Sequence, residues 1–546
     1  MVKYALYTTA VIIFFALILL PPILGIVIKW DTIQEVFNQP ELMARALGAI
    51  ENSFVIALIV SALDIITGVP MAWLITRGKS KWLSVLDTLS DIPFIVPTAV
   101  LGYSLLLFWK EPSGVSSLFG KSLISPGWLL VMLLHFAFSY PVVVRVIVGA
   151  LLDYKMEYEQ ASRTLGAPPL TASRTVTFPI LRPSLIAAFI LAFSRSISET
   201  GATIMVAGVF ENGPIFIQNM KDLLPTDQIS QITYEGSVVF ASFVLIAVSC
   251  LIFLVIRFLG MRFKLPIRKV WPTVERELSY SKASFSRNGV TLLIFFIIVF
   301  VPSLFVALPA FEAVFAGTFP KALSGIGIWG GYWQSLIISY ILGAVVTVLN
   351  VVIGLPMAII IARRKFGHLP SAILDVLTNI PLIVPSIALG VSLQFFWVKT
   401  FAFIPELLLL IFAHLAITYP YFVRSMSAAV ERISVDLEEA SRTLGAKPLG
   451  VFRTIILPLT KYSILSGAIM VFTRSISETG ATLAVLPSSS ALRTAPVVLV
   501  DWVPRFGKQK VLATPLDIGL GCGFLIMFSF IILLVLRLIV RGKGRY

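Results

Sequence analysis

The sequence predicts an all-α integral membrane protein whose twelve transmembrane helices form two parallel six-helix repeats. Of its 546 residues, 58% are hydrophobic and 13% are charged, and the mean hydropathy is +0.94. Soluble domains contain about a quarter charged residues, so this balance excludes that class. Twelve apolar runs are long enough to cross a bilayer. Several polar phrases also occur twice in the same order, which indicates a tandem repeat.

The apolar runs fall into two sets of six. A helix needs about 20 mostly apolar residues to cross the hydrocarbon core, and each run approaches or exceeds that length. The first set lies near residues 5–28, 53–76, 84–109, 127–150, 182–208 and 237–258, and the second lies near residues 289–308, 336–362, 373–397, 406–429, 460–486 and 516–540.

Repeated polar phrases relate the two sets. Each phrase returns after 279 to 288 residues, and the order along the chain is unchanged. The pairs are EQASRTLGA at Glu159 and EEASRTLGA at Glu438, HFAFSYPVVVR at His135 and HLAITYPYFVR at His414, FSRSISETGAT at Phe193 and FTRSISETGAT at Phe472, and DIPFIVPTAVLG at Asp91 and NIPLIVPSIALG at Asn379.

This duplication predicts the domain organisation. An even number of spans leaves both copies in the same orientation, related by an axis along the membrane normal. We therefore expect a first six-helix unit at 1–258 and a second at 289–546. The polar stretch 259–288 lacks a long apolar run and is expected to form a cytoplasmic linker.

Basic residues predict the orientation. Segment 257–288 holds eight Lys and Arg against two acids, whereas loop 209–236 holds one against four. By the positive-inside rule, the linker and both termini are cytoplasmic in a multi-pass protein of the cell membrane. The net charge of +15 then reflects basic residues concentrated on the cytoplasmic face, so we expect membrane lipid and no nucleic acid as partner. Loop 487–515 departs from the rule, because it is expected outside yet carries Arg493, Arg505, Lys508 and Lys510.

The phrase EQASRTLGA predicts a short helix between the fourth and fifth spans, on the cytoplasmic side. Gly166 and Pro168 follow the last helix-favouring residue and end the helix. Ala161 and Leu165 share one face, with charged residues beside them. Such a helix fits docking into a partner's groove and also folding back on its own domain, and the residue pattern alone leaves both open.

The repeated Glu-x-Ala-x-x-x-Gly is followed thirteen residues after the glycine by Pro179 and Pro458. This pattern resembles the cytoplasmic signature of ATP-binding-cassette importer permeases, and two copies in one chain resemble the fused permeases of the type I class. The resemblance implies that each phrase forms a coupling helix seated in a cleft of the ATPase subunit. It assigns this coupling role to Glu159, Ala161, Arg163 and Gly166 and to Glu438, Ala440, Arg442 and Gly445.

The same resemblance implies two copies of a separate ATPase subunit and an external solute-binding protein as partners. The chain itself shows no phosphate-binding loop: GVSSLFGKS at Gly114 has five residues between its first glycine and Gly-Lys-Ser, where four are needed. We therefore expect a transport subunit and not an enzyme, with ATP and Mg bound by the partner and no cofactor in this chain. Two cysteines and three scattered histidines predict no metal site.

A second repeated phrase, RSISETGAT, places charges within the fifth and eleventh spans. Arg and Glu are four residues apart in each copy, so we expect each pair to share one helix face. Charges at membrane depth usually face a protein interior or a water-filled path. A gate between the halves and a structural ion pair both fit this pattern. The candidate path residues are Arg195, Ser198, Glu199, Thr200, Arg474, Ser477, Glu478 and Thr479.

Prolines predict that the third span of each repeat is broken or kinked. Pro93 and Pro97 lie within the third span, and Pro381 and Pro385 repeat them in the ninth. Proline removes a backbone donor and clashes with the preceding helical turn. Breaks of this kind are tolerated at membrane depth where the backbone lines a path or is covered by protein.

The substrate is the least defined of these inferences. The fifth-span phrase is similar to that of sulfate, molybdate and tungstate permeases, whereas fusion of two units is more typical of ferric-iron and thiamine permeases. We expect a small inorganic ion, with an oxyanion favoured over ferric iron. An ion-coupled secondary transporter of six plus six helices is the alternative, since it would show the same parallel repeat. An intramembrane enzyme around His135 is disfavoured, because no acid is placed to orient the ring.

Overall fold

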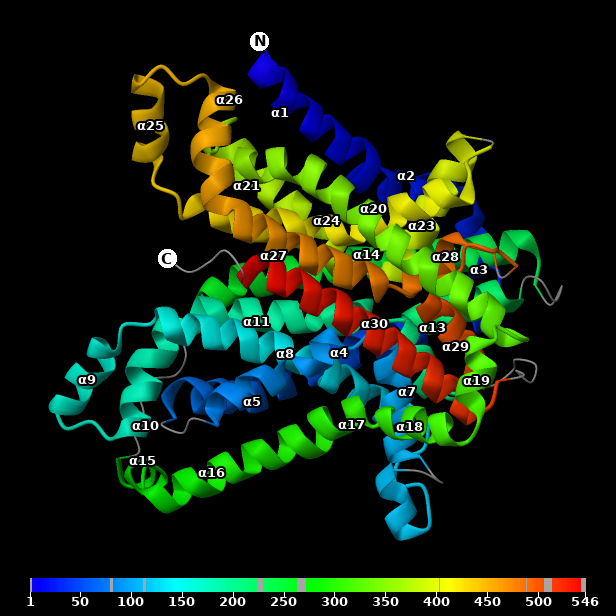
Figure 1. Cartoon of the computed structure of the whole chain (residues 1–546), viewed down its shortest axis with the longest axis horizontal. Coiled ribbons are helices and arrows are strands. Elements are labelled where there is room, and N and C mark those ends of the chain that lie inside the picture. The colour runs from blue at the N-terminus through cyan, green and yellow to red at the C-terminus, as the bar shows by residue number, and fades with distance from the viewer. Residues whose placement is uncertain are drawn as a thin grey trace.

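The computed structural model describes residues 2–78, 82–110, 114–223, 229–262, 272–401, 403–487, 489–504 and 513–541. Every regular element in these ranges is a helix (Figure 1). Ten helices within them have the length and hydropathy to cross a membrane, and one pair of helices, bent by 104°, brings the number to eleven. The predicted all-α membrane fold is confirmed. Residues 263–271 of the predicted linker, together with Arg505, Lys508 and Lys510, lie outside the described ranges.

The first repeat has helices at all six predicted spans, several of them in pieces, and five of the six are among the ten membrane-length helices, the third span being the exception. In chain order these are α1 Val2–Ile13, η1 Phe14–Leu19 and α2 Leu20–Ile28; α4 Pro40–Arg77; α5 Leu83–Ser90, α6 Ile92–Ile95 and α7 Thr98–Trp109; α8 Trp128–Asp153; α10 Pro169–Ala172, η4 Ser173–Thr177, α11 Phe178–Ser198 and α12 Gly201–Val206; and α14 Gln231–Arg262. Shorter helices between them are η2 Trp30–Ile33, α3 Gln34–Phe37, η3 Gly114–Phe119, α9 Met156–Thr164 and α13 Gly213–Leu223.

The second repeat follows the same order. Its spans are α16 Ser281–Ile294, η6 Phe295–Phe300 and α17 Val301–Leu304; α20 Ile328–Ala362; α21 His368–Thr378, α22 Ile380–Ile383 and α23 Ser386–Thr400; α24 Glu406–Glu431; α26 Pro448–Val451, η7 Phe452–Ile456, α27 Leu457–Ile476 and α28 Gly480–Val485; and α30 Pro515–Arg541. Its shorter helices are α18 Ala307–Phe315, α19 Thr318–Leu323, α25 Val435–Thr443 and α29 Ala495–Trp502, and α15 Pro272–Leu278 lies between the repeats.

The third span of each repeat is broken where the prolines predict. Val96 and Val384 have extended backbone, with ψ of 128° and 133°, and each precedes a proline. The ring of a proline disfavours helical backbone at the residue before it, which explains both breaks. In the second repeat the pieces on either side of the break form the pair bent by 104°. The predicted breaks are therefore confirmed.

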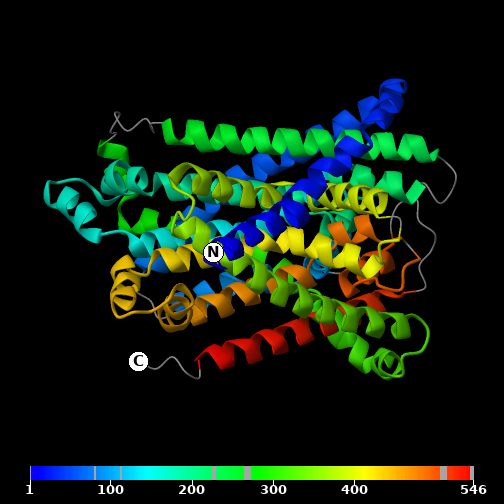
Figure 2. The ribbon, with the colours of Figure 1, turned by 90° about the horizontal axis from the view of Figure 1, so that it is seen from above.

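The first helix of each repeat packs against the other repeat. The α1–η1–α2 helix crosses the surface of the second repeat, over α20 and α24 (Figure 2). Phe14 stacks on Tyr419 at 5.6 Å between ring centroids, and the equivalent Phe295 stacks on Tyr140 at 6.1 Å. This reciprocal exchange joins the two units, whose sequence boundaries stay a prediction.

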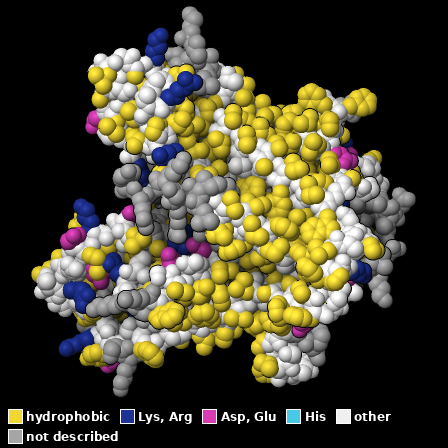
Figure 3. Space-filling model, viewed as in Figure 1, with side chains coloured by type: hydrophobic (Ala, Val, Ile, Leu, Met, Phe, Trp, Pro, Cys, Tyr) yellow, Lys and Arg dark blue, Asp and Glu magenta, His cyan; other side chains and the backbone are white. Residues whose placement is uncertain are grey.

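The surface separates a hydrophobic band from a charged end. Hydrophobic side chains cover most of the middle of the visible face, whereas Lys, Arg, Asp and Glu gather at the end that carries α9 and α25 (Figure 3). The linker helix α15 is held at this end, because Glu275 pairs with Arg174 at 2.7 Å. The Ser279 hydroxyl also accepts a hydrogen bond from the Leu170 amide at 3.2 Å. We call the charged end of the protein, which carries α9, α25 and α15, the α9/α25 end.

Candidate translocation path and coupling loops

The fifth span of each repeat is interrupted within the phrase RSISETGAT. Helix α11 ends at Ser198 and α12 begins at Gly201, while α27 ends at Ile476 and α28 begins at Gly480. The expectation that Arg and Glu share one helix face is therefore wrong, because each glutamate lies in the break beyond its helix. The cause is that the glutamate backbone leaves the helix so that its carboxylate can cap the next one.

Each of these glutamates caps the second piece of its span. Glu199 Oε1 accepts a hydrogen bond from the Ala202 amide at 3.0 Å, and Glu478 Oε1 accepts one from the Ala481 amide at 2.9 Å. The first amides of a helix have no partner within the helix, and a carboxylate there satisfies one of them and meets the positive end of the dipole. Both side chains are buried, so their charges are available only to groups inside the protein.

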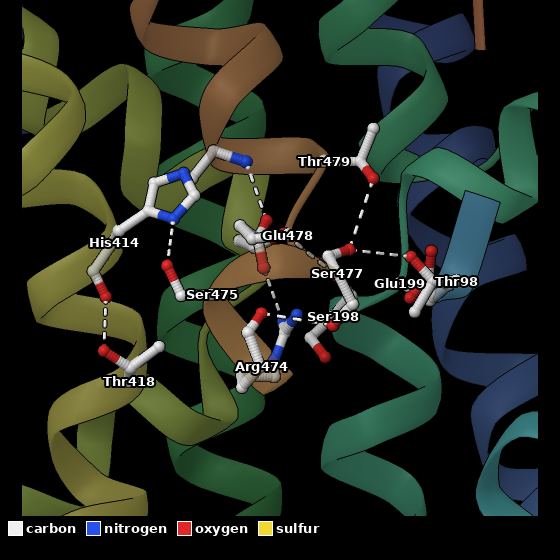
Figure 4. Close-up of polar contacts among 12 residues, drawn as sticks. Thr98, Ser198, Glu199, His414, Thr418, Arg474, Ser475, Ser477, Glu478 and Thr479 are labelled. Atoms are coloured by element: carbon white, nitrogen blue, oxygen red, sulfur yellow. Dashed lines mark hydrogen bonds and ion pairs between the residues drawn. The ribbon is translucent and has the colours of Figure 1, made fainter. Parts of the chain in front are cut away.

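A histidine clamps the two pieces of each fifth span. His135 bonds Ser196 through Nδ1 at 2.8 Å and Thr203 through Nε2 at 2.9 Å. His414 bonds Ser475 and Thr482 in the same way, both at 2.9 Å. Figure 4 shows the contact between His414 and Ser475. Both ring nitrogens therefore bond hydroxyls of the fifth span, one on each side of its break. These histidines hold the break in place.

The two arginines of the phrase have different partners. Arg474 pairs with Glu478 at 2.6 Å. Arg195 lies over the Phe138 ring at 3.7 Å from its centroid and donates from Nε to the Phe138 carbonyl at 3.4 Å. A guanidinium over an aromatic face gains a cation–π interaction, so Arg195 is held by a ring where Arg474 is held by a carboxylate. The repeats are thus chemically unequal at this point.

The third span of each repeat bonds the fifth-span break of the other. Thr98 Oγ1 donates to the Ser477 carbonyl at 3.0 Å, and Ser386 Oγ donates to the Ser198 carbonyl at 3.2 Å. Thr98 and Ser386 are equivalent, since they are the first residues of α7 and α23. Because both contacts cross between the repeats, the two breaks meet at their interface (Figure 4).

Glycines allow the two breaks to touch. A Cβ atom on Gly201 would lie 2.5 Å from the Cβ of Thr479, and one on Gly480 would lie 2.8 Å from Oγ1 of Thr200. Both threonines are buried at this contact. Glycine is needed for such close approach. The interface between the repeats is therefore closed at this level, and we call this closure the seal.

A cavity of about 550 Å³ opens between the repeats on the α9/α25 side of the seal. Arg145 and Arg424 lie in the last third of α8 and α24, which lead into α9 and α25. Arg195 also lines a much smaller cavity beside Arg474 and Ser477, so it connects the two spaces. We call the large cavity the vestibule. Its polar lining includes Asp91, Arg145, Ser194, Arg195, Tyr421 and Arg424.

A lysine closes the opposite side of the seal. The Lys221 ammonium donates to the carbonyls of Leu483, Ala484 and Leu486 at 2.5, 2.7 and 2.8 Å. A cation at the end of a helix satisfies its last carbonyls and meets the negative end of the dipole. Burial lowers the pKa of Lys221 to about 8. Through Lys221, the first repeat thus bonds the end of α28 in the second repeat, on the side of the seal away from the α9/α25 end.

The predicted coupling phrases form α9 and α25, which project from the protein (Figure 1). Each helix ends at a glycine with positive φ, 92° at Gly166 and 87° at Gly445. The Ala167 amide donates to the Ser162 carbonyl at 3.2 Å and the Gly166 amide to the Arg163 carbonyl at 3.0 Å, which is the Schellman arrangement. The glycines therefore set the direction in which the chain returns to the membrane.

Leucines beside these glycines are the most exposed apolar residues of the coupling phrases. Leu165 is 90% exposed and Leu444 is 88% exposed. The predicted Ala161, Arg163, Ala440 and Arg442 are exposed around them. The coupling residues predicted from the sequence do not include these leucines, although each lies four residues after the alanine of its phrase. Exposed leucines at a helix end favour contact with a partner protein.

The coupling glutamates point into the protein and not toward a partner. Glu159 is 5% exposed and Glu438 is 3% exposed. Glu438 accepts from Arg363 Nε at 2.7 Å, and Arg77 lies 3.9 Å from Glu159 in the first repeat. Arg77 and Arg363 lie at the ends of the second spans, and this recurrence in the sequence is a signal for the pairing. The glutamates therefore position the coupling helices by bonding them to the spans.

Comparison with known proteins is in agreement with this architecture. The family described as binding-protein-dependent transport system inner membrane component matches the chain twice, at residues 64–265 and 354–541. The sulfate transport system permease protein CysT of Salmonella typhimurium is 34% identical over 208 residues, which are 36% of this chain and 72% of the relative.

Two further relatives are similar over a comparable length. The probable sulfate transport system permease protein of Marchantia polymorpha is 31% identical over 256 residues, 45% of this chain and 84% of the relative. The CysT protein of Synechococcus elongatus is 30% identical over 251 residues, 44% of this chain and 87% of the relative. Each relative thus corresponds to about one repeat. The chain belongs to the binding-protein-dependent transport system inner membrane components, the permeases of type I ATP-binding-cassette importers, with two copies of the family domain in one polypeptide.

Proposed function

We propose that the chain passes an oxyanion such as sulfate from an external binding protein to the cytoplasm. The observation that carries this proposal is the arginine lining on one side of the seal: Arg145, Arg195 and Arg424 line the vestibule. Guanidinium groups match the geometry of tetrahedral oxyanions and repel cations. The names of the similar sulfate permeases support the same class.

Molybdate and tungstate share the charge and shape of sulfate, so the same lining accommodates them. Ferric iron is disfavoured, because a cation would have to pass two or more arginines at the vestibule. The candidate path residues at the seal, Ser198, Thr200, Ser477 and Thr479, would then separate to admit the anion. The charged residues Arg195, Glu199, Arg474 and Glu478 would hold the pieces of the fifth spans during that movement.

The coupling role is proposed for α9 and α25. Their exposed surfaces carry Ala161, Leu165 and Gly166 in one repeat and Ala440, Leu444 and Gly445 in the other. The α9/α25 end would face the cytoplasm, where two copies of an ATPase subunit bind ATP and Mg and hydrolyse the ATP. The units 1–258 and 289–546 would each present one such dock, with 259–288 as the cytoplasmic linker between them.

Uptake measurements test this function. Proteoliposomes containing the chain, its ATPase and its binding protein are expected to accumulate radiolabelled sulfate only when ATP is supplied, with inhibition by excess molybdate and none by ferric iron. An uncoupler should leave the uptake unchanged. Uptake that stops with an uncoupler while ATP remains would contradict the proposal and favour the ion-coupled secondary transporter.

The repeat predicts the stoichiometry of the assembly. Two equivalent docks related by a pseudo-two-fold axis match a two-fold-symmetric pair of ATPase subunits. One chain already contains both halves of the path, so we expect one permease chain, two ATPase subunits and at most one binding protein. Native mass spectrometry of the detergent-solubilised complex measures this ratio. Two permease chains for each ATPase pair would show that the interface between the repeats is not the path.

A further inference from the structure

Arg145 and Arg424 occupy equivalent positions in the two repeats and line the same vestibule, yet their partners differ. Arg145 forms ion pairs with Asp87 at 3.2 Å and with Asp91. Arg424 donates from Nη1 to the amide oxygen of Asn379 at 3.0 Å, and within the described ranges it makes no ion pair. Asn379 is the counterpart of Asp91, and Asp375, the counterpart of Asp87, forms no ion pair within the described ranges. Arg424 therefore keeps its positive charge toward the cavity.

A hydroxyl on another wall of the vestibule also lacks a partner. Ser194 is 2% exposed, and its Oγ bonds no group in the described part of the chain. Leaving a buried hydroxyl without a hydrogen bond costs free energy, so such groups point to a ligand or water. Its counterpart Thr473 donates to the Ile469 carbonyl at 2.8 Å and so has a partner in its own helix. Of these two equivalent residues, only Ser194 has a hydroxyl without a partner in the described part of the chain.

We propose that Arg424, together with the Ser194 hydroxyl and Arg195, forms a binding site for a tetrahedral oxyanion in the vestibule. The proposal rests on the proposed function and deepens it, because it names the residues that receive the anion after the seal. A guanidinium donates two parallel hydrogen bonds to an oxyanion, and a serine hydroxyl donates one more. Arg195 extends the positive surface from this site to the small cavity at the seal.

The different pairing of Arg145 and Arg424 favours release of the anion as well as its binding. If Arg145 also lacked an acidic partner, it would add a third guanidinium charge to those of Arg195 and Arg424 in the lining, which would hold a divalent anion more tightly and slow its departure. Transport needs a site that is favourable enough to enter and weak enough to leave. Pairing with two aspartates offsets the charge of Arg145, while the neutral Asn379 leaves the charge of Arg424 in place. The roughly 550 Å³ of the vestibule also leaves room for water around the ion.

Equilibrium dialysis of radiolabelled inorganic sulfate tests the site. The purified full chain at low ionic strength is compared with its Arg424→Gln and Asn379→Asp variants. Each variant is expected to raise the half-saturating sulfate concentration by about tenfold or more, because a charge-assisted hydrogen bond is lost or an acid competes for the arginine. The Asn379→Asp chain is expected to fold, since the first repeat already carries an aspartate at that position.

The matched control is Asp91→Asn, which places the asparagine of the second repeat in the first. Arg145 keeps Asp87, so we expect the half-saturating concentration to change by less than about threefold. Equal binding by the unchanged chain and Arg424→Gln, with uptake of sulfate intact, would overturn the site and leave the proposed function standing. An Asp91→Asn effect as large as that of Asn379→Asp would also overturn it, since the response would belong to the whole cavity. Absence of sulfate uptake by the unchanged chain would overturn the function itself.

Discussion

Replacing Gly166 and Gly445 together with tryptophan is expected to abolish ATP-driven uptake while the chain remains folded in the membrane. Both glycines lie at the exposed ends of α9 and α25, and a Cβ atom at either would meet no atom within 4 Å. The indole rings therefore find space on the chain itself but occupy the surface that we propose binds the ATPase. We expect the uptake rate to fall at least about a hundredfold, as for residues at the centre of an interface.

Backbone strain must be separated from bulk in that experiment. Both glycines have positive φ, which costs an L-residue roughly 1–2 kcal/mol. The Gly166→Ala and Gly445→Ala pair introduces this strain with almost no bulk, so it serves as the matched control. We expect the alanine chain to keep most of its uptake and its ATPase on co-purification. Equal loss in both chains would show that the turn, and not a docking surface, is what uptake requires.

The repeat made most of the fold predictable. Polar phrases that return at nearly constant spacing predict two equivalent units, and the spans follow from run length alone. The third-span breaks were also predictable, because Pro97 and Pro385 act through local sterics that do not depend on the rest of the protein. Local signals of this kind are read directly from the residues.

The fifth-span breaks were not predictable in the same way. No proline lies at Glu199 or Glu478, and the Ser, Thr and Gly around them also occur in continuous membrane helices. The break depends on the capping carboxylates, on the histidine clamps and on contact with the other repeat, all of which are tertiary. The packing of the first helix of each repeat against the other repeat was not predictable for a related reason. An apolar run is equally compatible with packing against either repeat.

In the coupling loops, the structure shows a side-chain direction that the sequence could not predict. The pattern placed Glu159 and Glu438 among the coupling residues but did not show which way they point. The structure turns them inward toward Arg77 and Arg363, two positions that recur at the ends of the second spans. A charged side chain near a membrane edge can be stabilised either by water or by a charged partner in the protein. Which of the two it contacts depends on the tertiary structure and cannot be predicted from the local sequence.

Glu478→Gln is expected to destabilise the chain much more than Glu199→Gln, although the two positions are equivalent by sequence. Glutamine keeps an oxygen that can cap the following helix in either repeat. In the second repeat, however, it leaves Arg474 without the carboxylate that lies 2.6 Å away, in surroundings where the two side chains are 11% and 2% exposed. Removing one partner of a buried pair costs about 3–5 kcal/mol. Within the described residues Glu199 forms no ion pair, so we expect a loss closer to 1 kcal/mol there, as for a weakened helix cap.

Thermal unfolding of the two purified variants measures this difference, and uptake by the more stable one then tests the path. If the fifth-span pieces move when the seal opens, the Glu199→Gln chain should be well folded, should retain its ATPase on co-purification and should still transport slowly, because its cap on α12 is weaker during that movement. Equal melting temperatures for the two variants would contradict the unequal pairing of Arg195 and Arg474. Full uptake by a well-folded Glu199→Gln chain would show that the Glu199 carboxylate serves packing alone. The charged groups that matter for the path would then be the arginines.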